Sequence, residues 1–83
     1  MVHEIELKPG ALKDLRKVGR KQASKIADGL ERLAQGLQGD VKKLTNFSPE
    51  FRLRIGQYRV LFDMEGLRIV VYRIVKRDEA YRS

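Results

Sequence analysis

The chain has 83 residues, with 18 Lys and Arg against 11 Asp and Glu, and its net charge of +7 is enough to attract nucleic acid or an acidic protein. Its length predicts a single domain over residues 1–83 with a modest core, which excludes a deep enclosed pocket. The absence of cysteine excludes disulfides and thiolate metal sites. The longest apolar run, Ile69–Tyr72, is too short to cross a bilayer, and no signal-peptide pattern begins the chain. We therefore expect a cytoplasmic protein that does not contact a membrane.

The first half of the chain predicts a strand and a short helix. Residues 2–8 alternate imperfectly and are expected to form a strand that ends at Pro9-Gly10. From Ala11 the period becomes helical, and Gly19 is placed to cap the end of this helix. Its expected apolar stripe is Leu12, Leu15 and Val18, and its expected outward residues are Lys13, Asp14, Arg16 and Lys17.

A longer amphipathic helix is expected from about Lys21 to the Gly36 and Gly39 region. Gly29 lies inside it, at a cost of about 1 kcal/mol relative to Ala. The apolar stripe of this helix is Ala23, Ile26, Ala27, Leu30, Leu33, Ala34 and Leu37. The following segment, Asp40–Glu50, is expected to be a loop.

The second half of the chain predicts a three-stranded meander. Residues 51–55 alternate strictly between apolar and cationic side chains, and Gly56-Gln57 is a break of hairpin length. Residues 58–64 repeat the same sidedness up to a second turn at Glu65-Gly66. Residues 67–75 are rich in β-branched side chains on both faces, as in an interior strand, and a polar tail follows.

These elements predict an α+β two-layer sandwich in the order β-α-α-β-β-β. The helical hairpin should pack on one face of a mainly antiparallel four-stranded sheet, leaving the other face largely open. The side chains expected on the covered face are Phe51, Leu53, Ile55, Tyr58, Val60 and Phe62.

Arginines on strands or at strand ends are the candidate functional residues, because their direction is fixed and arginine grips phosphate in a defined geometry. They are Arg52, Arg54, Arg59, Arg68, Arg73 and Arg77. Arg52 and Arg54 also fit the solvated face of an edge strand, and Arg59 also fits an ion pair with Asp63 or Glu79.

The run FRLRIGQYRVLF, together with the tail KRDEAYR, resembles the RelE/ParE superfamily of bacterial and archaeal toxins over nearly the whole chain. The resemblance implies a RelE-type toxin of a type II toxin-antitoxin system. Such a toxin enters the ribosomal A site and cleaves mRNA without a metal or other cofactor, through attack of a ribose 2′-hydroxyl on the adjacent phosphate. Its implied partners are the ribosome, mRNA, an acidic RelB-like antitoxin and, through that antitoxin, operator DNA.

The resemblance also implies roles for individual residues. Arg59 matches the sheet arginine of the Tyr-Arg pair, Arg77 the arginine after the last strand, and Tyr81 the tail tyrosine, while Arg54 is a fourth catalytic candidate. The candidate RNA-binding residues are Arg52, Lys42, Lys43 and Lys76. Many relatives have Gly-His where this chain has Val75-Lys76, so the role of that histidine is absent here.

The chemistry can be tested against the residues alone. Arginines can stabilise charge on a phosphate, but an acid and a base are also needed. The only histidine, His3, is at the other end of the chain. Tyr81 is the candidate base, although a free tyrosine has a pKa of about 10 and needs nearby guanidinium groups to lower it. Tyr81 equally fits a packing role. A site of this composition is expected to depend on the ribosome to hold the mRNA in an attack geometry.

Three other functions fit the same residues. One is a ParE-type inhibitor of DNA gyrase on the same fold. The second is a non-catalytic nucleic-acid-binding module, which would bind naked RNA or DNA with strong salt dependence. The third is a degraded toxin kept for its antitoxin, which the Val75-Lys76 departure favours.

Overall fold

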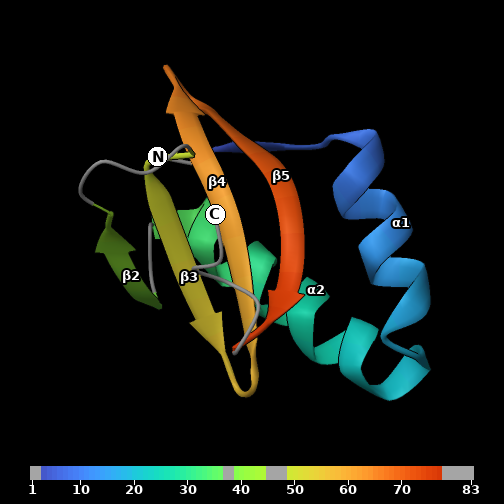
Figure 1. Ribbon diagram of the computed structural model, residues 1–83. Helices are drawn as coiled ribbons and strands as arrows, with labels where there is room; N and C mark the ends of the chain where they lie inside the picture. The colour runs from blue at the N-terminus through green and yellow to red at the C-terminus, as the bar shows by residue number, and fades with distance from the viewer. Residues whose placement is uncertain (1–2, 37–38, 45–48, 78–83) are drawn as a thin grey trace.

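The computed structural model describes residues 3–36, 39–44 and 49–77, which form two helices against a five-stranded sheet (Figure 1). The elements are β1 (Glu4–Leu7), α1 (Pro9–Lys17), α2 (Arg20–Gly36), β2 (Asp40–Lys43), β3 (Phe51–Ile55), β4 (Tyr58–Glu65) and β5 (Arg68–Lys76). The strand order is β1-β5-β4-β3-β2, with β1 parallel to β5 and all other neighbours antiparallel. The predicted α+β sandwich and its element order are confirmed, with one strand more than expected.

The additional strand is β2, in a segment that the sequence predicts to be a loop. It pairs with β3 from Asp40 opposite Arg54 to Lys43 opposite Phe51. All four of its residues are exposed, so it has no apolar period for sequence analysis to detect. Gly39 precedes it with a φ of 131°, and a Cβ there would lie 2.7 Å from Leu53 Cδ1. Backbone pairing, rather than burial, therefore makes this strand.

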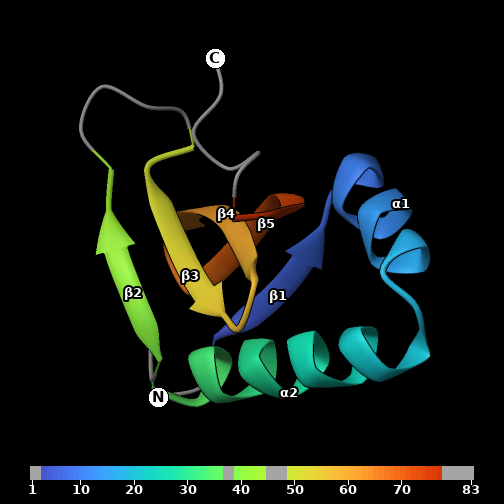
Figure 2. The same cartoon turned by 60° about the horizontal axis from the view of Figure 1, so that its bottom comes forward.

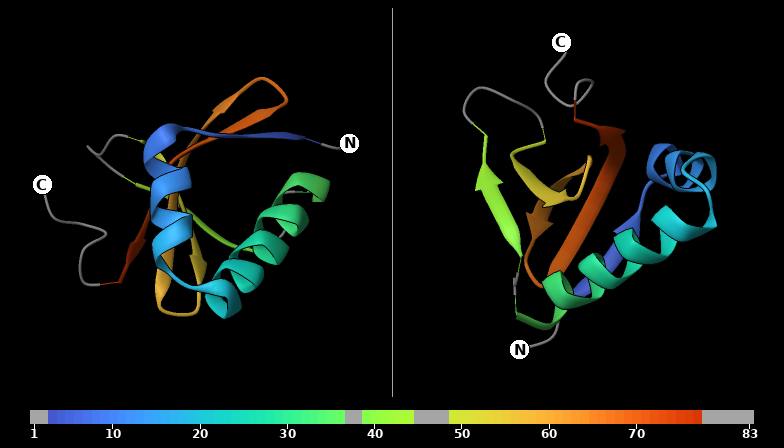
Figure 3. Two further views of the ribbon diagram at one scale, coloured as in Figure 1. Left: turned by 90° about the vertical axis from the view of Figure 1, so that its right-hand side faces the viewer. Right: turned by 90° about the horizontal axis from the view of Figure 1, so that it is seen from below.

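Both helices lie on one side of the sheet, where α2 crosses below the strands and α1 runs beside β5 (Figures 2 and 3). The core between the layers contains Ile26 and Leu33 from α2, with Leu53 and Phe62 from the sheet. The six side chains predicted to face the helices all belong to this core or pack against it, which confirms the alternation in β3 and β4. Neither helix in the described ranges is long and apolar enough to span a membrane.

The structure corrects the first residue of α1 and one residue of its predicted apolar stripe. The helix begins at Pro9, not at Ala11, because a proline at the first helical position loses no hydrogen bond. Its buried residue is Ala11, whereas Leu12 is 40 % exposed. Gly10 lets α1 approach β5 closely, since a Cβ there would lie 3.2 Å from Tyr72 O.

Asp14, predicted to point outward from α1, instead faces β5. Its side chain is only 11 % exposed, and its carboxylate accepts hydrogen bonds from Arg73 Nε at 2.7 Å and Arg73 Nη2 at 3.1 Å. It also accepts one from the backbone N–H of Ile74 at 2.9 Å. Its partners are about sixty residues away in sequence, which is why helical periodicity does not reveal them.

The strands β3, β4 and β5 are joined by two glycine turns, and the pairing of β4 with β5 contains one irregularity. Gly56 and Gly66 have φ values of 58° and 63°, as the two predicted hairpin turns require. Leu61 of β4 pairs with Arg73 of β5, and the next residue, Phe62, pairs with Val71. Tyr72 of β5 therefore has no partner in the ladder and forms a β-bulge. Leu61 and Val75 form a second small cluster with Leu44 on the face away from the helices, which is therefore only partly open. Val70, between Ile69 and Val71 of the helix-side core, is a further buried apolar residue of that face.

Candidate functional site

Two arginines stand directly opposite each other on the sheet face away from the helices. Arg54 on β3 pairs with Arg59 on β4, while Leu53 and Val60 beside them point into the core. Cross-strand partners share a face and lie close together. Two like charges therefore lie opposite each other here, where an opposite-charge pair would be more favourable. We call the surface formed by Arg52, Arg54, Arg59 and Arg77 the arginine face.

Arg59 is buried, with only 7 % of the residue exposed. Its Nη1 donates hydrogen bonds to Gly56 O and Tyr58 O, both at 3.1 Å, so the side chain folds back over the β3–β4 turn. Within the described ranges it has no carboxylate partner. The predicted alternative of a pair with Asp63 is wrong, because Asp63 Oδ1 instead accepts the backbone N–H of Glu50 at 2.6 Å. The other candidate, Glu79, lies outside the described residues.

Asp40 partly neutralises the other side of the arginine face. Its Oδ1 lies 3.6 Å from Arg52 Nη1, and its Oδ2 lies 3.7 Å from Arg54 Nη1. Arg52 also donates to Asp40 O at 3.2 Å, while its Nε is buried without a partner. Sequence analysis missed Asp40 because the segment was expected to be a loop. One exposed carboxylate between two guanidinium groups leaves a net positive charge.

Arg77 joins the same surface from β5. Its backbone N–H donates to Gln57 O at 2.8 Å, which fixes the chain beside the turn that the Arg59 side chain covers. Val75 pairs with Arg59, and Arg77 follows Val75 by two residues, so strand alternation puts Arg77 on the face of Arg59 and diagonal to it. Arg77 is exposed. Arg54 and Arg59 thus lie opposite each other on β3 and β4, and Arg77 follows the end of β5 beside the turn that joins those two strands.

The lysine candidates do not all lie on this surface. Lys42 pairs with Arg52 and shares its face, whereas Lys43 pairs with Phe51, which packs against the core on the helix side. Lys76 pairs with Tyr58 and also lies on the helix side. Lys42 and Lys43 belong to β2 instead of the predicted loop. The arginine face and Lys76 are therefore on opposite sides of the sheet.

The candidate general base, Tyr81, lies outside the described residues. His3 is far from the arginine face, and its Nδ1 is 3.3 Å from Ala34 O at the end of α2. In residues 3–36, 39–44 and 49–77, no group of three His, Cys, Asp or Glu could hold a metal ion. What the described residues supply is a set of fixed guanidinium groups, which bind and stabilise a phosphate but are poor proton acceptors.

Two helices packed on one face of a five-stranded, mainly antiparallel sheet define this basic protein as a small α+β two-layer sandwich. Comparisons with known proteins narrow this class. The sequence profile described as "ParE toxin of type II toxin-antitoxin system, parDE" matches residues 5–81. The chain therefore belongs to the ParE toxin family of type II toxin-antitoxin systems, within the RelE/ParE superfamily. No curated protein sequence matches it significantly.

Solved structures share its fold at low sequence identity. The toxin-antitoxin complex RelBE2 from Mycobacterium tuberculosis aligns with a TM-score of 0.80 and 20% identity, covering 93% of this chain and 100% of the other. The RelE-RelB complex from Pyrococcus horikoshii OT3 aligns with a TM-score of 0.75 and 19% identity, covering 96% of this chain and 100% of the other. The RelB-RelE complex from Methanococcus jannaschii aligns with a TM-score of 0.73 and 24% identity, covering 90% of this chain and 93% of the other. These similarities establish the shared fold.

Proposed function

We propose that this toxin is a ribosome-dependent endoribonuclease that cleaves mRNA in the A site without a metal. The observation that carries the proposal is the buried guanidinium of Arg59, held by two backbone carbonyls opposite Arg54 and without a described carboxylate partner. A buried cation without a counter-ion is costly unless an anion is bound there. Paired guanidinium groups match the oxygen geometry of phosphate and of carboxylate, so a phosphodiester fits them.

The reaction is an internal transfer at phosphorus. The ribose 2′-oxygen bonds to the adjacent phosphorus and loses its proton to a base, while the bond from phosphorus to the 5′-oxygen breaks and that oxygen takes a proton. The products are a 2′,3′-cyclic phosphate and a 5′-hydroxyl. Arg54, Arg59 and Arg77 would stabilise the negative charge that grows on the phosphate oxygens, and Tyr81 would take the 2′-hydroxyl proton.

Dependence on the ribosome follows from what the arginine face lacks. Guanidinium groups stabilise charge but do not align the 2′-oxygen with the leaving 5′-oxygen. Holding the reacting atoms in line accounts for a large part of catalysis in such reactions. The ribosome would supply this alignment by fixing the mRNA in the A site. Naked RNA should therefore be cut far more slowly than mRNA on ribosomes.

Primer extension on a reporter mRNA tests the proposal after induced expression, and in a reconstituted translation reaction. We expect new 5′ ends in register with codons. Replacing Arg59 with Gln should slow cleavage about 100-fold or more, as removal of one preorganised donor does in other enzymes. Arg68→Gln is the matched control, because Arg68 is a strand arginine that pairs with Glu4 and Glu6 away from the arginine face. Growth arrest without any new mRNA ends would contradict the proposal.

Inhibition of DNA gyrase is the second candidate function, favoured by the ParE description of the matching family. A supercoiling assay with purified protein distinguishes the two. Inhibition of gyrase at protein concentrations that leave ribosome-bound mRNA intact would favour this function. If Arg59→Gln and Arg68→Gln lost gyrase inhibition to the same extent, the inhibition would not depend specifically on the arginine face.

We further propose an acidic RelB-like antitoxin as the partner, with operator DNA bound through that antitoxin. Two of the structures with a similar fold, from Methanococcus jannaschii and Pyrococcus horikoshii OT3, are complexes of RelE with RelB. An acidic chain would neutralise the +7 charge and cover the arginine face or displace the Tyr81 tail. A structure of the pair in which that face and tail are both uncovered would contradict this.

A further inference from the structure

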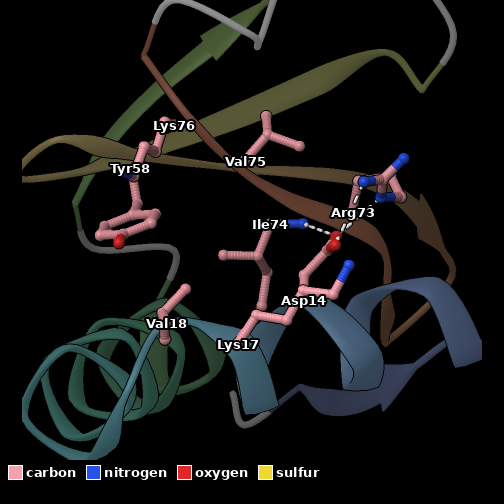
Figure 4. Close-up of a pocket in the computed structure, with 8 residues that line it drawn as sticks. All are labelled: Asp14, Lys17, Val18, Tyr58, Arg73, Ile74, Val75 and Lys76. Atoms are coloured by element: carbon pink, nitrogen blue, oxygen red, sulfur yellow. Dashed lines mark hydrogen bonds and ion pairs between the residues drawn. The ribbon is translucent and has the colours of Figure 1, made fainter.

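A second cationic surface lies on the helix side of the sheet, opposite the arginine face. Two adjoining clefts of about 290 and 320 Å³ share Tyr58 and Lys76 as lining residues. Lys17 at the end of α1 lines the first cleft, and Lys25 on α2 lines the second. Figure 4 shows Lys17, Tyr58 and Lys76 around the first cleft. We call these two clefts the lysine groove.

The described residues leave a net positive charge in the lysine groove. Lys17, Lys25 and Lys76 are exposed, and none makes an ion pair with a carboxylate in the described ranges. Among the described residues, Asp14 is the only acidic one that lines either cleft, and its carboxylate is occupied by Arg73 and the Ile74 N–H. From this part of the chain, an anion in the groove would meet three ammonium groups and no carboxylate without a partner.

We propose that the lysine groove binds the sugar-phosphate backbone of RNA, as a second contact separate from the arginine face. Three lysines spaced along a groove are typical of contacts to successive phosphates, which position a nucleic acid without reading its sequence. Tyr58 adds an aromatic ring in the middle of the groove, on which a ribose or base can pack. The choice of RNA over DNA rests on the proposed function.

The position of the groove gives it a purpose in the proposed reaction. Lys76 and Arg77 are consecutive, and they point to opposite sides of the end of β5. Contacts on both sides would hold that strand end between two RNA segments, one under the arginine face and one in the groove. Binding the groove would thus orient the arginine face, without any groove lysine touching the reacting phosphate.

Salt-dependent binding of a 2′-O-methylated RNA hairpin, which cannot be cleaved, tests the proposal by fluorescence anisotropy. The full-length protein is compared with the triple variant Lys17→Gln/Lys25→Gln/Lys76→Gln. The control triple variant, Lys8→Gln/Lys13→Gln/Arg68→Gln, removes the same charge outside the groove. The slope of the logarithm of the association constant against the logarithm of salt concentration is negative. We expect its magnitude to decrease by about 2 to 3 in the groove variant and by less than about 1 in the control. If the groove triple variant does not fold, each single variant should lower the magnitude of the slope by about 0.7 to 0.9.

Several results would overturn the inference. Equal slopes for the groove and control variants would show that only overall charge matters. A groove variant that loses affinity for duplex DNA but keeps its RNA affinity would assign the groove to DNA. Loss of binding to an acidic peptide, with RNA binding intact, would assign it to a protein partner. If the wild-type protein leaves ribosome-bound mRNA uncut while the groove variant loses RNA affinity, the groove stands and the proposed nuclease activity fails.

Discussion

Only 7 % of the residue Arg59 is exposed, and it faces a second arginine across the β3–β4 ladder. A buried charge without a carboxylate partner and a like charge directly opposite both destabilise the fold. We therefore predict that Arg59→Met raises the free energy of unfolding by about 1 kcal/mol or more while it abolishes toxicity. Urea unfolding measures the first effect and growth on induction the second.

Arg68→Met is the control for this prediction. Arg68 is half-exposed and pairs with Glu4 and Glu6, so its loss should slightly lower stability and leave toxicity unchanged. The two variants remove the same charge from strands of one sheet. A fall in stability for Arg59→Met as large as that for Arg68→Met would show that Arg59 is a structural residue.

Asp14 is expected to stabilise the fold through its three hydrogen bonds to Arg73 and Ile74. Asp14→Asn should lower the free energy of unfolding by about 1.5 to 3 kcal/mol at neutral pH, since bonds to a charged group are lost. Asp28→Asn, which removes an exposed carboxylate of α2, should have little effect. Urea unfolding of the two variants at pH 7 measures the difference.

The pH dependence of the same variant follows from the pKa of Asp14. Burial raises this pKa, but hydrogen bonds from Arg73 and Ile74 N–H and the charges of Arg73 and Lys17 outweigh burial and lower it overall. A carboxyl with a lowered folded-state pKa adds stability above its unfolded pKa of about 3.9, and this is lost as pH falls through the folded value. The gap between wild type and Asp14→Asn should therefore narrow below about pH 4. A gap that widens in acid would contradict this assignment.

At the scale of elements, the contact between α2 and β3 depends on Gly29. A Cβ at this position would lie 2.5 Å from Ile55 Cδ1. In the Ile55→Ala background, which removes Cδ1 and also Cγ1, 3.1 Å from the same Cβ, Gly29→Ala should stabilise the protein by up to about 1 kcal/mol through helix propensity. In the wild-type background the same change should give less stability or none, because Ile55 must move. Unfolding of the four proteins in a double-mutant cycle measures the coupling, and equal effects in both backgrounds would show that the contact imposes no constraint.

The elements that sequence analysis predicted correctly are those with a strong burial period or a turn residue. The alternation in β3 and β4 and the turns at Gly56 and Gly66 are confirmed. Of the stripe predicted on α2, Ile26, Leu30, Leu33 and Ala34 are buried, whereas Ala27 is exposed and Leu37 lies outside the described residues. The strand β2 was missed because pairing with β3 makes it without burying any of its residues. On α1, Leu15 and Val18 pack against the core as predicted, but Leu12 is exposed and Ala11 is the buried residue.

The candidate site was predictable in part for the same physical reason. Strand alternation put Arg54 and Arg59 on one face, and the register confirms that placement. The burial of Arg59 and the position of Asp40 between Arg52 and Arg54 depend on contacts between segments distant in sequence. The Asp14–Arg73 pair is of the same kind. Such pairs have no sequence period, and only the folded structure reveals them.

At the scale of the whole molecule, the net charge of +7 acts over dimensions of 30 × 30 × 22 Å. At about 0.01 M salt the Debye length is roughly 30 Å, so each charge is felt across the whole protein, and at about 1 M it is roughly 3 Å. The described ion pairs lie mainly on the surface, where each contributes little. Repulsion among the excess cations should therefore dominate the salt dependence of stability.

We predict that the unfolding temperature rises as sodium chloride is increased from about 0.01 M to about 0.3 M, because screening weakens that repulsion. Arg54→Gln/Arg59→Met should reduce this rise, since it removes two like charges that lie directly opposite each other in the sheet. Lys13→Gln/Arg32→Gln removes the same charge from the exposed sides of the helices and should preserve most of it. Thermal unfolding, followed by circular dichroism, measures the slope of unfolding temperature against salt concentration for the wild type and both variants. An unfolding temperature that falls with salt in the wild type would show that its ion pairs outweigh its net charge, and identical slopes in both variants would show that the arginine face is not the main centre of repulsion.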